Sequence, residues 1–171
     1  MKLIVFSGLP GTGKSKLAEA VGSELGIPVF AKDWLEAGLL RSRLTVSDEN
    51  SSLGATSYDL LTMLAERQMS LHQSVILDSV ASTESIRSTW REICRKYHAE
   101  WRVVECICSD ESVHRERLTI RQRNIPGWHE LEWAEVERVR TYYVTWNEKR
   151  LIVDSIQSFD SNLVAVLEYC R

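Results

Sequence analysis

The sequence predicts an α/β fold in which helices flank a five-stranded parallel sheet. Five short apolar runs alternate with longer stretches of helical spacing, which is typical of parallel strands joined by right-handed crossovers. A glycine-rich turn follows the first run, and polar residues end most of the others. The 171 residues, 44% hydrophobic and 26% charged, have an ordinary globular composition, so we expect residues 1–171 to form a single domain.

Each predicted strand is a short, apolar, β-rich run that lacks the periodicity of a helix. The first of them is Lys2-Leu3-Ile4-Val5-Phe6, and the fourth reads EWRVVECIC. The five runs cover residues 2–6, 27–31, 74–78, 100–108 and 151–154. Ligands of parallel sheets bind at the carboxyl ends of the strands, so the residues that follow these runs are the first candidates for a site.

Predicted helices lie between the strands, where apolar residues recur every three or four positions. They cover residues 17–25, 34–41, 58–71, 82–97, 110–123, 132–149 and 161–169. Asp33 is expected to cap the second of these helices, and Ser109 or Asp110 the fifth. The polar stretch 42–56 is predicted to be a loop. A mobile lid, which would exclude water during a reaction, is predicted within residues 122–140.

The turn after the first strand matches the Walker A pattern G-x-x-x-x-G-K-[ST], which binds phosphate. The residues of this phosphate loop are Gly8, Leu9, Pro10, Gly11, Thr12, Gly13, Lys14 and Ser15. The glycines permit positive φ angles, so that successive amides can point inward at phosphate oxygens. Lys14 can reach the β- and γ-phosphates, and the Ser15 hydroxyl can ligate Mg²⁺. ATP and Mg²⁺ are therefore the expected cofactors; the alternative is a glycine-rich turn that matches by accident.

Three carboxylates at predicted strand ends are candidates for chemistry. Asp78 follows the third strand, where we expect it to hold Mg²⁺ near Ser15, although an Asp here could instead cap the next loop. Asp154, after the fifth strand, is a weaker rival for the metal. Asp33 could accept the proton of a hydroxyl that attacks the γ-phosphorus, and capping the next helix is its alternative role.

Two arginines on the predicted helix 110–123 are candidates for contacts with ATP. Arg117 and Arg121 are four residues apart, which places them on one helix face. One guanidinium could lie over the base or the α-phosphate, and the other on the transferring γ-phosphoryl group. The alternative is a solvated basic face paired with Glu111 and Glu116.

Residues near Asp33 and in the predicted lid are candidates for binding the phosphate acceptor. Trp34 follows Asp33 directly, Glu36 lies three residues after Asp33, and Trp128 lies in the lid. Trp133 and Trp146 could also line an acceptor cavity, but a place in the core would explain any of these aromatic residues equally well.

Charge and hydropathy limit the partners and the location of the protein. A net charge of −3 and a pI near 5.8 give no overall attraction to nucleic acid. No apolar run approaches the roughly 20 residues of a membrane span, and the first strand begins at once, so we expect a cytoplasmic protein. Cys106 and Cys108 are expected to face one side of the fourth strand, and all four cysteines to be free thiols.

Taken together, these residues resemble the small P-loop kinases, in particular the group with zeta toxins, chloramphenicol phosphotransferase and the kinase domain of polynucleotide kinase. The phosphate loop carries most of the resemblance, and the Lys32-Asp33 and Leu77-Asp78 strand ends add to it through their order. The resemblance implies a sheet order of 2-3-1-4-5. It also implies that Asp33 is the general base, that Arg121 contacts the γ-phosphate, and that Arg117 packs near the adenine.

One position departs from this family and bears on the acceptor. Polynucleotide kinases have Asp-x-x-Arg after the second strand, where the arginine grips a substrate phosphate, but the matching residue here is Glu36. A carboxylate would repel a phosphate, which favours a small hydroxylated metabolite or antibiotic-like acceptor over nucleic acid. The sequence therefore predicts an ATP-dependent phosphotransferase, with a nucleoside or polynucleotide 5′-kinase as the first alternative. A non-catalytic nucleotide switch or a plain ATPase is an alternative of another class.

Overall fold

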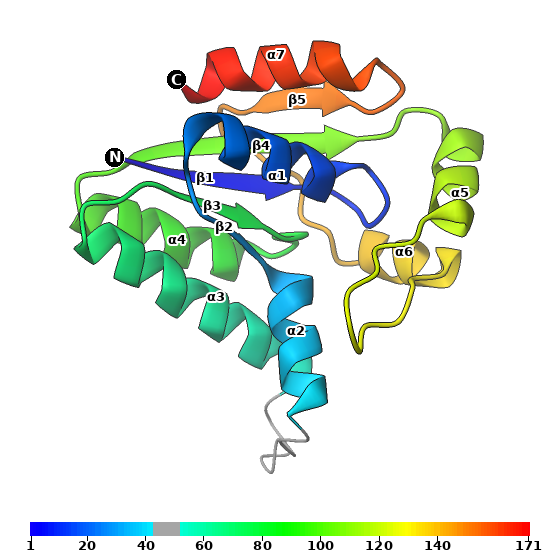
Figure 1. The fold of residues 1–171 in the computed structure, drawn as a ribbon, viewed down its shortest axis with the longest axis horizontal. Coiled ribbons are helices and arrows are strands. Elements are labelled where there is room, and N and C mark those ends of the chain that lie inside the picture. Colours follow the sequence, from blue (N-terminus) through cyan, green and yellow to red (C-terminus); the bar gives the residue numbers. More distant parts are fainter. Residues whose placement is uncertain (43–51) are drawn as a thin grey trace.

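The computed structural model describes residues 1–42 and 52–171, and the predicted loop 42–56 lies mostly outside this range (Figure 1). One or two helices lie between successive strands, as the apolar runs predict. The elements are β1 (Lys2–Ser7), α1 (Lys14–Leu25), β2 (Val29–Ala31), α2 (Lys32–Arg41), α3 (Leu53–Ser70), β3 (Val75–Asp78), α4 (Glu84–Lys96), β4 (Glu100–Ile107), α5 (Glu111–Ile120), α6 (Trp133–Arg140), β5 (Leu151–Asp154) and α7 (Phe159–Cys170).

The five strands form one parallel sheet in the order β2-β3-β1-β4-β5, which confirms the predicted fold class and order. β1 is central and pairs Val5 with Leu77 of β3 and with Val103 of β4. Figure 1 shows the strands pointing toward the same edge, beyond which α5 and α6 lie, while both chain ends lie at the other edge. The strand ends with the candidate site residues therefore meet at one place.

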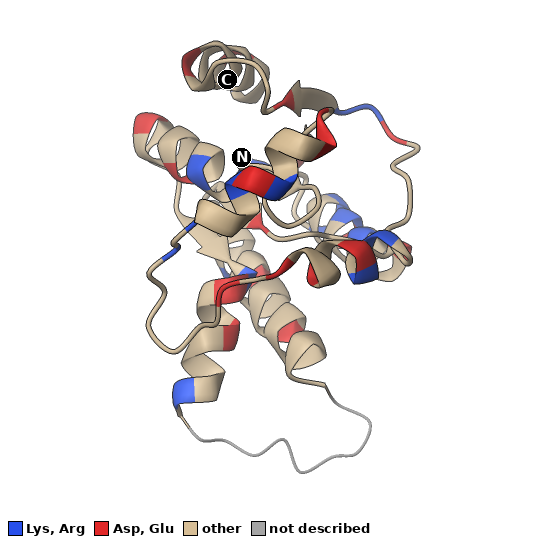
Figure 2. Ribbon diagram, turned by 90° about the vertical axis from the view of Figure 1, so that its right-hand side faces the viewer, with Lys and Arg blue, Asp and Glu red and all other residues tan. Residues whose placement is uncertain are grey.

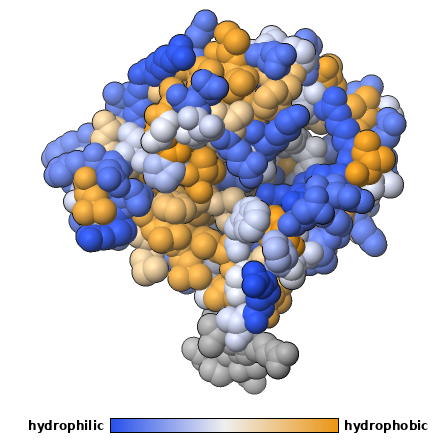
Figure 3. All heavy atoms as spheres, in the orientation of Figure 1, coloured by the Kyte–Doolittle hydropathy of each residue, from blue (hydrophilic) through white to orange (hydrophobic). Residues whose placement is uncertain are grey.

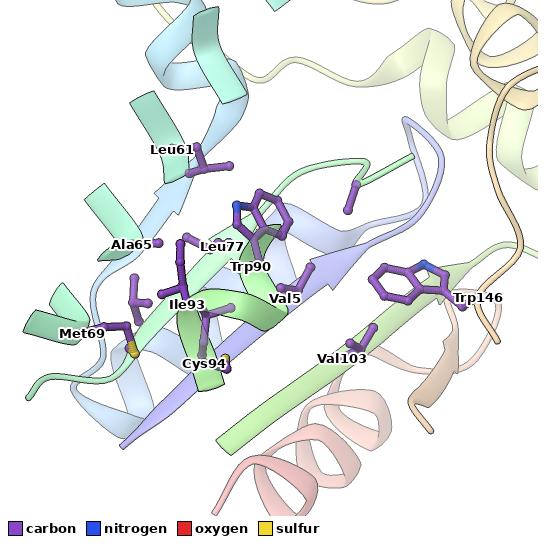
Figure 4. Packing of buried hydrophobic residues seen from close by; sticks show 13 residues of the cluster. Val5, Leu61, Ala65, Met69, Leu77, Trp90, Ile93, Cys94, Val103 and Trp146 are labelled. Carbon is purple, nitrogen blue, oxygen red and sulfur yellow. The ribbon is translucent and has the colours of Figure 1, made fainter. Parts of the chain in front are cut away.

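Side chains alternate between the two faces of β1, and each face is covered by helices. Leu3 and Val5 face a core formed with α3 and α4, which Figure 4 shows around Trp90. Ile4 and Phe6 face a second core formed with α1 and α7. All four of these β1 side chains are fully buried, so the strand that leads into the phosphate loop is held rigidly from both sides.

Several helix boundaries differ from the predictions. α3 begins at Leu53 and not near Tyr58, because Ser52 caps it by accepting a hydrogen bond from the amide of Ala55 (3.1 Å). α5 ends at Ile120 and α6 at Arg140, several residues before the predicted ends at 123 and 149. Much of the segment that connects α6 to β5 therefore has no regular secondary structure.

The cysteines are free, as predicted, and three of the four are buried. Cys106 lies within β4, but the strand ends at Ile107, so the expectation that Cys108 shares its strand face is wrong. Burial raises the pKa of Cys94 and that of Cys106 to about 12, so these thiols stay protonated at neutral pH. None of the helices in the described ranges has the length and apolar character that a membrane crossing needs.

Candidate active site

The phosphate loop connects β1 to α1 in the geometry that its glycines permit. Gly8, Gly11 and Gly13 have φ angles of +135°, +87° and +84°. A Cβ atom on Gly8 would lie 2.1 Å from the Cys106 carbonyl oxygen, so only glycine fits there. No side chain caps α1, so its first amides and positive end are left to face an anion.

A histidine that the sequence analysis did not single out supports the back of this loop. His114 of α5 is 2% exposed, and its Nε2 atom lies 2.7 Å from the carbonyl oxygen of Pro10. Because a carbonyl only accepts, Nε2 carries the hydrogen and donates it. Burial lowers the pKa of His114, which favours its neutral form. Only the fold reveals this contact, because 104 residues separate the two partners.

Asp78 lies at the end of β3 beside the phosphate loop and fits a metal ligand. Asp78 is 4% exposed, and its Oδ1 atom is buried without a hydrogen-bond partner. Burial raises the pKa of Asp78, although the positive charge of Lys14 and the hydroxyl of Ser15 beside it oppose the rise. An unpaired carboxylate next to a hydroxyl is the donor set that Mg²⁺ accepts.

Asp154, the weaker rival for the metal, is occupied by backbone groups. Its Oδ1 atom accepts hydrogen bonds from the amides of Ser109 (3.1 Å) and Ile156 (3.2 Å). Burial works against ionisation here, but these hydrogen bonds lower the pKa of Asp154. Asp154 therefore holds the backbone at Ser109 and Ile156 in place, and Asp78 remains the candidate metal ligand.

Asp33 lies next to Asp78, because β2 and β3 are neighbours and Ala31 pairs with Asp78 across the sheet. The expected helix-capping role is wrong: α2 begins at Lys32, Ala31 occupies the cap position, and Asp33 lies in the first turn. Its carboxylate forms an ion pair with Arg123. The sequence analysis did not single out Arg123 as a site residue, and no local pattern marks a pair 90 residues apart.

The two predicted arginines, Arg117 and Arg121, lie on different elements. They do not share a helix face, because α5 ends at Ile120 and Arg121 is extended. Arg117 is on the helix and donates a hydrogen bond to the Ser155 carbonyl oxygen (2.6 Å). The Nε and Nη2 atoms of Arg121 are buried without a hydrogen-bond partner, and Nε lies 3.8 Å from a carboxylate oxygen of Glu130.

Two arginines, Arg121 and Arg123, lie close together in the loop after α5. Burial, together with the like charge of Arg123, lowers the pKa of Arg121. A buried guanidinium with unsatisfied donors is unfavourable unless an anion completes its hydrogen bonds. Figure 2 looks onto this edge of the sheet and shows basic and acidic residues on the helices and loops around it. An oxyanion between Lys14 and Arg121 would satisfy this arrangement.

Two cavities meet at the phosphate loop and share Gly13, Lys16 and Arg117. The larger, about 500 Å³, also contains Trp34 and Arg121, and the smaller, about 330 Å³, extends to Phe159 and Asn162 beside β5. Mainly hydrophilic residues cover α5 and α6 in the space-filling view of Figure 3. The arrangement provides two adjoining compartments beside the phosphate loop.

The remaining acceptor candidates are only partly brought together. Trp34 is 50% exposed and lines the larger cavity, whereas Glu36 forms an ion pair with Lys32. Trp128 of the predicted lid stacks on His129, with ring centroids 4.9 Å apart.

Two other tryptophans have structural surroundings. Trp146 is a core residue, 2% exposed, and donates a hydrogen bond to Ser7 Oγ (3.1 Å). The guanidinium of Arg115 lies over the ring of Trp133, 4.1 Å from its centroid, and the His114 ring stands at 83° to that of Trp133. Trp146 is therefore a core residue, as the alternative interpretation predicts, whereas a place for Trp133 at an acceptor cavity stays a prediction.

Comparisons with known proteins agree with this geometry. A family model described as an AAA domain, AAA_33, matches residues 3–143. No curated protein matches the chain. A solved structure from Chloroflexus aurantiacus, described as a kinase without a named substrate, is similar over 99% of this chain and 98% of its own, with 22% identity and a TM-score of 0.76.

Two further solved structures have the same fold. A gluconokinase from Sinorhizobium meliloti has 20% identity and a TM-score of 0.66, and the match covers 98% of this chain and 94% of the gluconokinase. An APS kinase from Mycobacterium tuberculosis, in complex with AMPPNP and APS, has 22% identity and a TM-score of 0.64 over 99% and 96% of the two chains. At these identities the likeness establishes the fold.

Proposed function

The chain belongs to the AAA_33 family of AAA domains, and on that premise we propose that it is an ATP-dependent kinase that phosphorylates a hydroxyl group of a small molecule. One observation carries the proposal: Arg123, the ion-pair partner of Asp33, lines the same cavity as Lys14 and Ser15, so the candidate general base lies beside the phosphate loop. Similarity to a gluconokinase and to an APS kinase supports a small acceptor.

The phosphate loop would bind the triphosphate through its inward-facing amides and Lys14. The nucleobase would lie in the smaller cavity beside β5. The γ-phosphate would then point into the larger cavity. Arg121 would donate its unsatisfied N–H groups to the oxygens of that phosphate, where negative charge develops during transfer. Asp33 would orient the acceptor hydroxyl and take its proton as the oxygen attacks phosphorus.

Ser15 and Asp78 would hold Mg²⁺, which neutralises phosphate charge during transfer. The unpaired Oδ1 atom of Asp78 supports this assignment. The predicted lid, residues 122–140, would close over the acceptor. Its Gly127 has a φ of +80° and packs so tightly that an added Cβ would lie 2.6 Å from Cγ of Arg41 in α2. Closure would exclude water and suppress hydrolysis of ATP.

The experiment is a transfer assay with ATP labelled at the γ-phosphate and a panel of sugars, sugar acids, nucleosides and short oligonucleotides. We expect label in an organic phosphate ester, and loss of this transfer in Asp33→Asn with nucleotide affinity retained. Asp59→Asn, which changes an exposed aspartate of α3, is the matched control and should leave transfer unchanged.

Three outcomes separate the proposal from its alternatives. Label only in inorganic phosphate, whatever hydroxyl compound is added, would identify an ATPase or a nucleotide switch. Label at the 5′ end of an oligonucleotide would identify a polynucleotide kinase. Transfer that survives in Asp33→Asn would reject Asp33 as the base while leaving the kinase activity in place.

A further inference from the structure

Arg123 is the basic residue of the site that the proposed reaction does not use. The larger cavity is lined by five basic side chains and one acidic side chain, which are Lys14, Lys16, Arg117, Arg121, Arg123 and Glu19. Lys14 and Arg121 are assigned to the phosphates. Arg117 lines both cavities. Lys16 lies over the Phe159 ring, 4.5 Å from its centroid, in the smaller cavity that is expected to hold the nucleobase. Arg123 faces the acceptor side.

The burial of Arg123 restricts what this side chain can do. It is 9% exposed, and its partner, the Asp33 carboxylate, is 25% exposed. Its backbone amide donates a hydrogen bond to Glu130 (2.7 Å), which anchors the loop that carries it. A buried charge that loses its partner is strongly unfavourable. Arg123 can therefore leave Asp33 only if another anion takes the place of that carboxylate.

Asp33 must be exposed to the acceptor hydroxyl if it is to orient and deprotonate it. A neutral polyol has no charge with which to displace a buried guanidinium from a carboxylate. A carboxylate or phosphate group on the acceptor does, and the planar guanidinium matches either group through two parallel hydrogen bonds.

The environment of Glu36 no longer argues against such an acceptor. The sequence analysis used the negative charge of Glu36 to disfavour acceptor phosphates. In the structure this carboxylate is paired with Lys32, both side chains are 15% exposed, and the pair has no net charge. Repulsion from this position is therefore cancelled.

We propose that the acceptor carries a carboxylate or phosphate group, and that Arg123 exchanges Asp33 for this group and so releases the base. This inference rests on the proposed kinase function and specifies its substrate class. It explains how Asp33 stays paired with Arg123 until the correct acceptor binds, because the ion pair between Arg123 and Asp33 is then replaced by one between Arg123 and the acceptor. The cavity of about 500 Å³ also has to admit the γ-phosphate, which favours a compact acceptor.

The test measures binding and not only transfer. Protein loaded with Mg²⁺ and a non-hydrolysable ATP analogue is titrated by calorimetry with matched pairs of probes. The pairs are gluconate with glucitol, glycerate with glycerol, and a nucleoside 3′-phosphate with the nucleoside. The first two pairs report carboxylate recognition and the third reports phosphate recognition. Each titration is repeated with Arg123→Gln and with Arg95→Gln, which removes an exposed arginine from α4 as the control.

We expect at least one anionic probe to bind about 10- to 100-fold more tightly than its neutral partner, the range for a charge-assisted hydrogen bond. Arg123→Gln should abolish this preference, and Arg95→Gln should retain it. Equal affinity within every pair, absence of binding by all three anions, or a preference that survives in Arg123→Gln would overturn the inference. If Arg123→Gln does not fold, the preference of the unmodified protein decides.

The experiments distinguish a failure of this inference from a failure of the proposed kinase function. A protein that binds the anions through Arg123 but transfers no phosphate to any hydroxyl would refute the kinase and keep the anion site. Efficient transfer to neutral acceptors alone would keep the kinase and refute the anion site.

Discussion

Replacing Asp78 with asparagine should stabilise the nucleotide-free protein while removing the proposed ligand of Mg²⁺. Burial raises the pKa of this carboxyl group, so the folded protein holds its proton more tightly than the unfolded chain does. Stability from this group is therefore present below its ordinary pKa of 3.8 and is lost as the pH rises through the raised value. Above that raised pKa, the ionised carboxylate, whose Oδ1 atom has no hydrogen-bond partner, destabilises the fold, and a neutral amide of the same shape removes this cost.

The size of the effect follows from the surroundings of the carboxylate. Leaving a buried polar group unsatisfied costs about 1–3 kcal/mol. Lys14 offsets part of this cost, so we expect Asp78→Asn to raise the free energy of unfolding by about 1 kcal/mol. For a chain of this length that is a rise in Tm of about 2–4 °C.

Thermal unfolding should then show a reversal of order when ligand is added. Nucleotide and Mg²⁺ at about 100 times their Kd stabilise a protein by about 2.7 kcal/mol, and Asp78→Asn should lose most of this gain. The unmodified protein should therefore be the less stable of the two without ligand and the more stable with it. The difference without ligand should shrink as the pH falls toward 4.

The control is Asp154→Asn. The ionised carboxylate of Asp154 accepts two backbone hydrogen bonds, and a neutral amide oxygen accepts them more weakly, so this variant should lower Tm. A lower Tm for ligand-free Asp78→Asn would refute the reasoning, because it would mean that the Asp78 carboxylate stabilises the fold in the absence of metal.

Two further predictions concern residues around the proposed phosphate site. Arg121→Gln should lower kcat by about 10²- to 10³-fold and change the affinity for an ATP analogue only a few-fold, because its N–H groups act on charge that develops in transfer. An equal loss in affinity would instead assign Arg121 to ground-state binding. His114→Leu should lower the free energy of urea unfolding by about 1–3 kcal/mol, because the phosphate-loop carbonyl loses its donor, and His114→Gln should recover part of it. Identical unfolding curves for the two variants would show that this hydrogen bond contributes nothing.

The sheet and the phosphate loop could be predicted because local sequence determines both. Buried parallel strands need short apolar runs, and the runs that end at Asp78 and Asp154 show this. The order of strand, glycine turn and helix around Gly8 and Lys14 is equally local. Asp33 lies two residues beyond the end of β2, in the first turn of α2, so its place near a strand end could be predicted for the same reason.

Contacts between distant segments could not be predicted. Nothing in residues 121–123 breaks a helix, so the end of α5 at Ile120 has no local signal, and the ion pair between Arg123 and Asp33 belongs to the extended loop that follows. The short α6 did have a signal, because Tyr142, Tyr143 and Val144 form an aromatic and β-branched run that favours extended structure.

Residues of this run also form hydrogen bonds with residues far away along the chain, and these bonds hold the run in place. The hydroxyl of Tyr143 donates a hydrogen bond to Glu105 (2.9 Å), and Arg87 donates one to the carbonyl oxygen of Val144 (2.6 Å). A single strand pattern or helix pattern does not contain this information, because each bond joins elements that meet only in the folded protein.

The central claim is that the amides of the phosphate loop and Lys14 bind a nucleoside triphosphate whose last phosphate faces Asp33. Calorimetric titration of the protein with a non-hydrolysable ATP analogue, with and without Mg²⁺, tests it most directly. We predict binding at a single site that Mg²⁺ strengthens and that Lys14→Met abolishes. The absence of binding heat with ATP and GTP analogues alike, or equal affinity in Lys14→Met, would contradict the account.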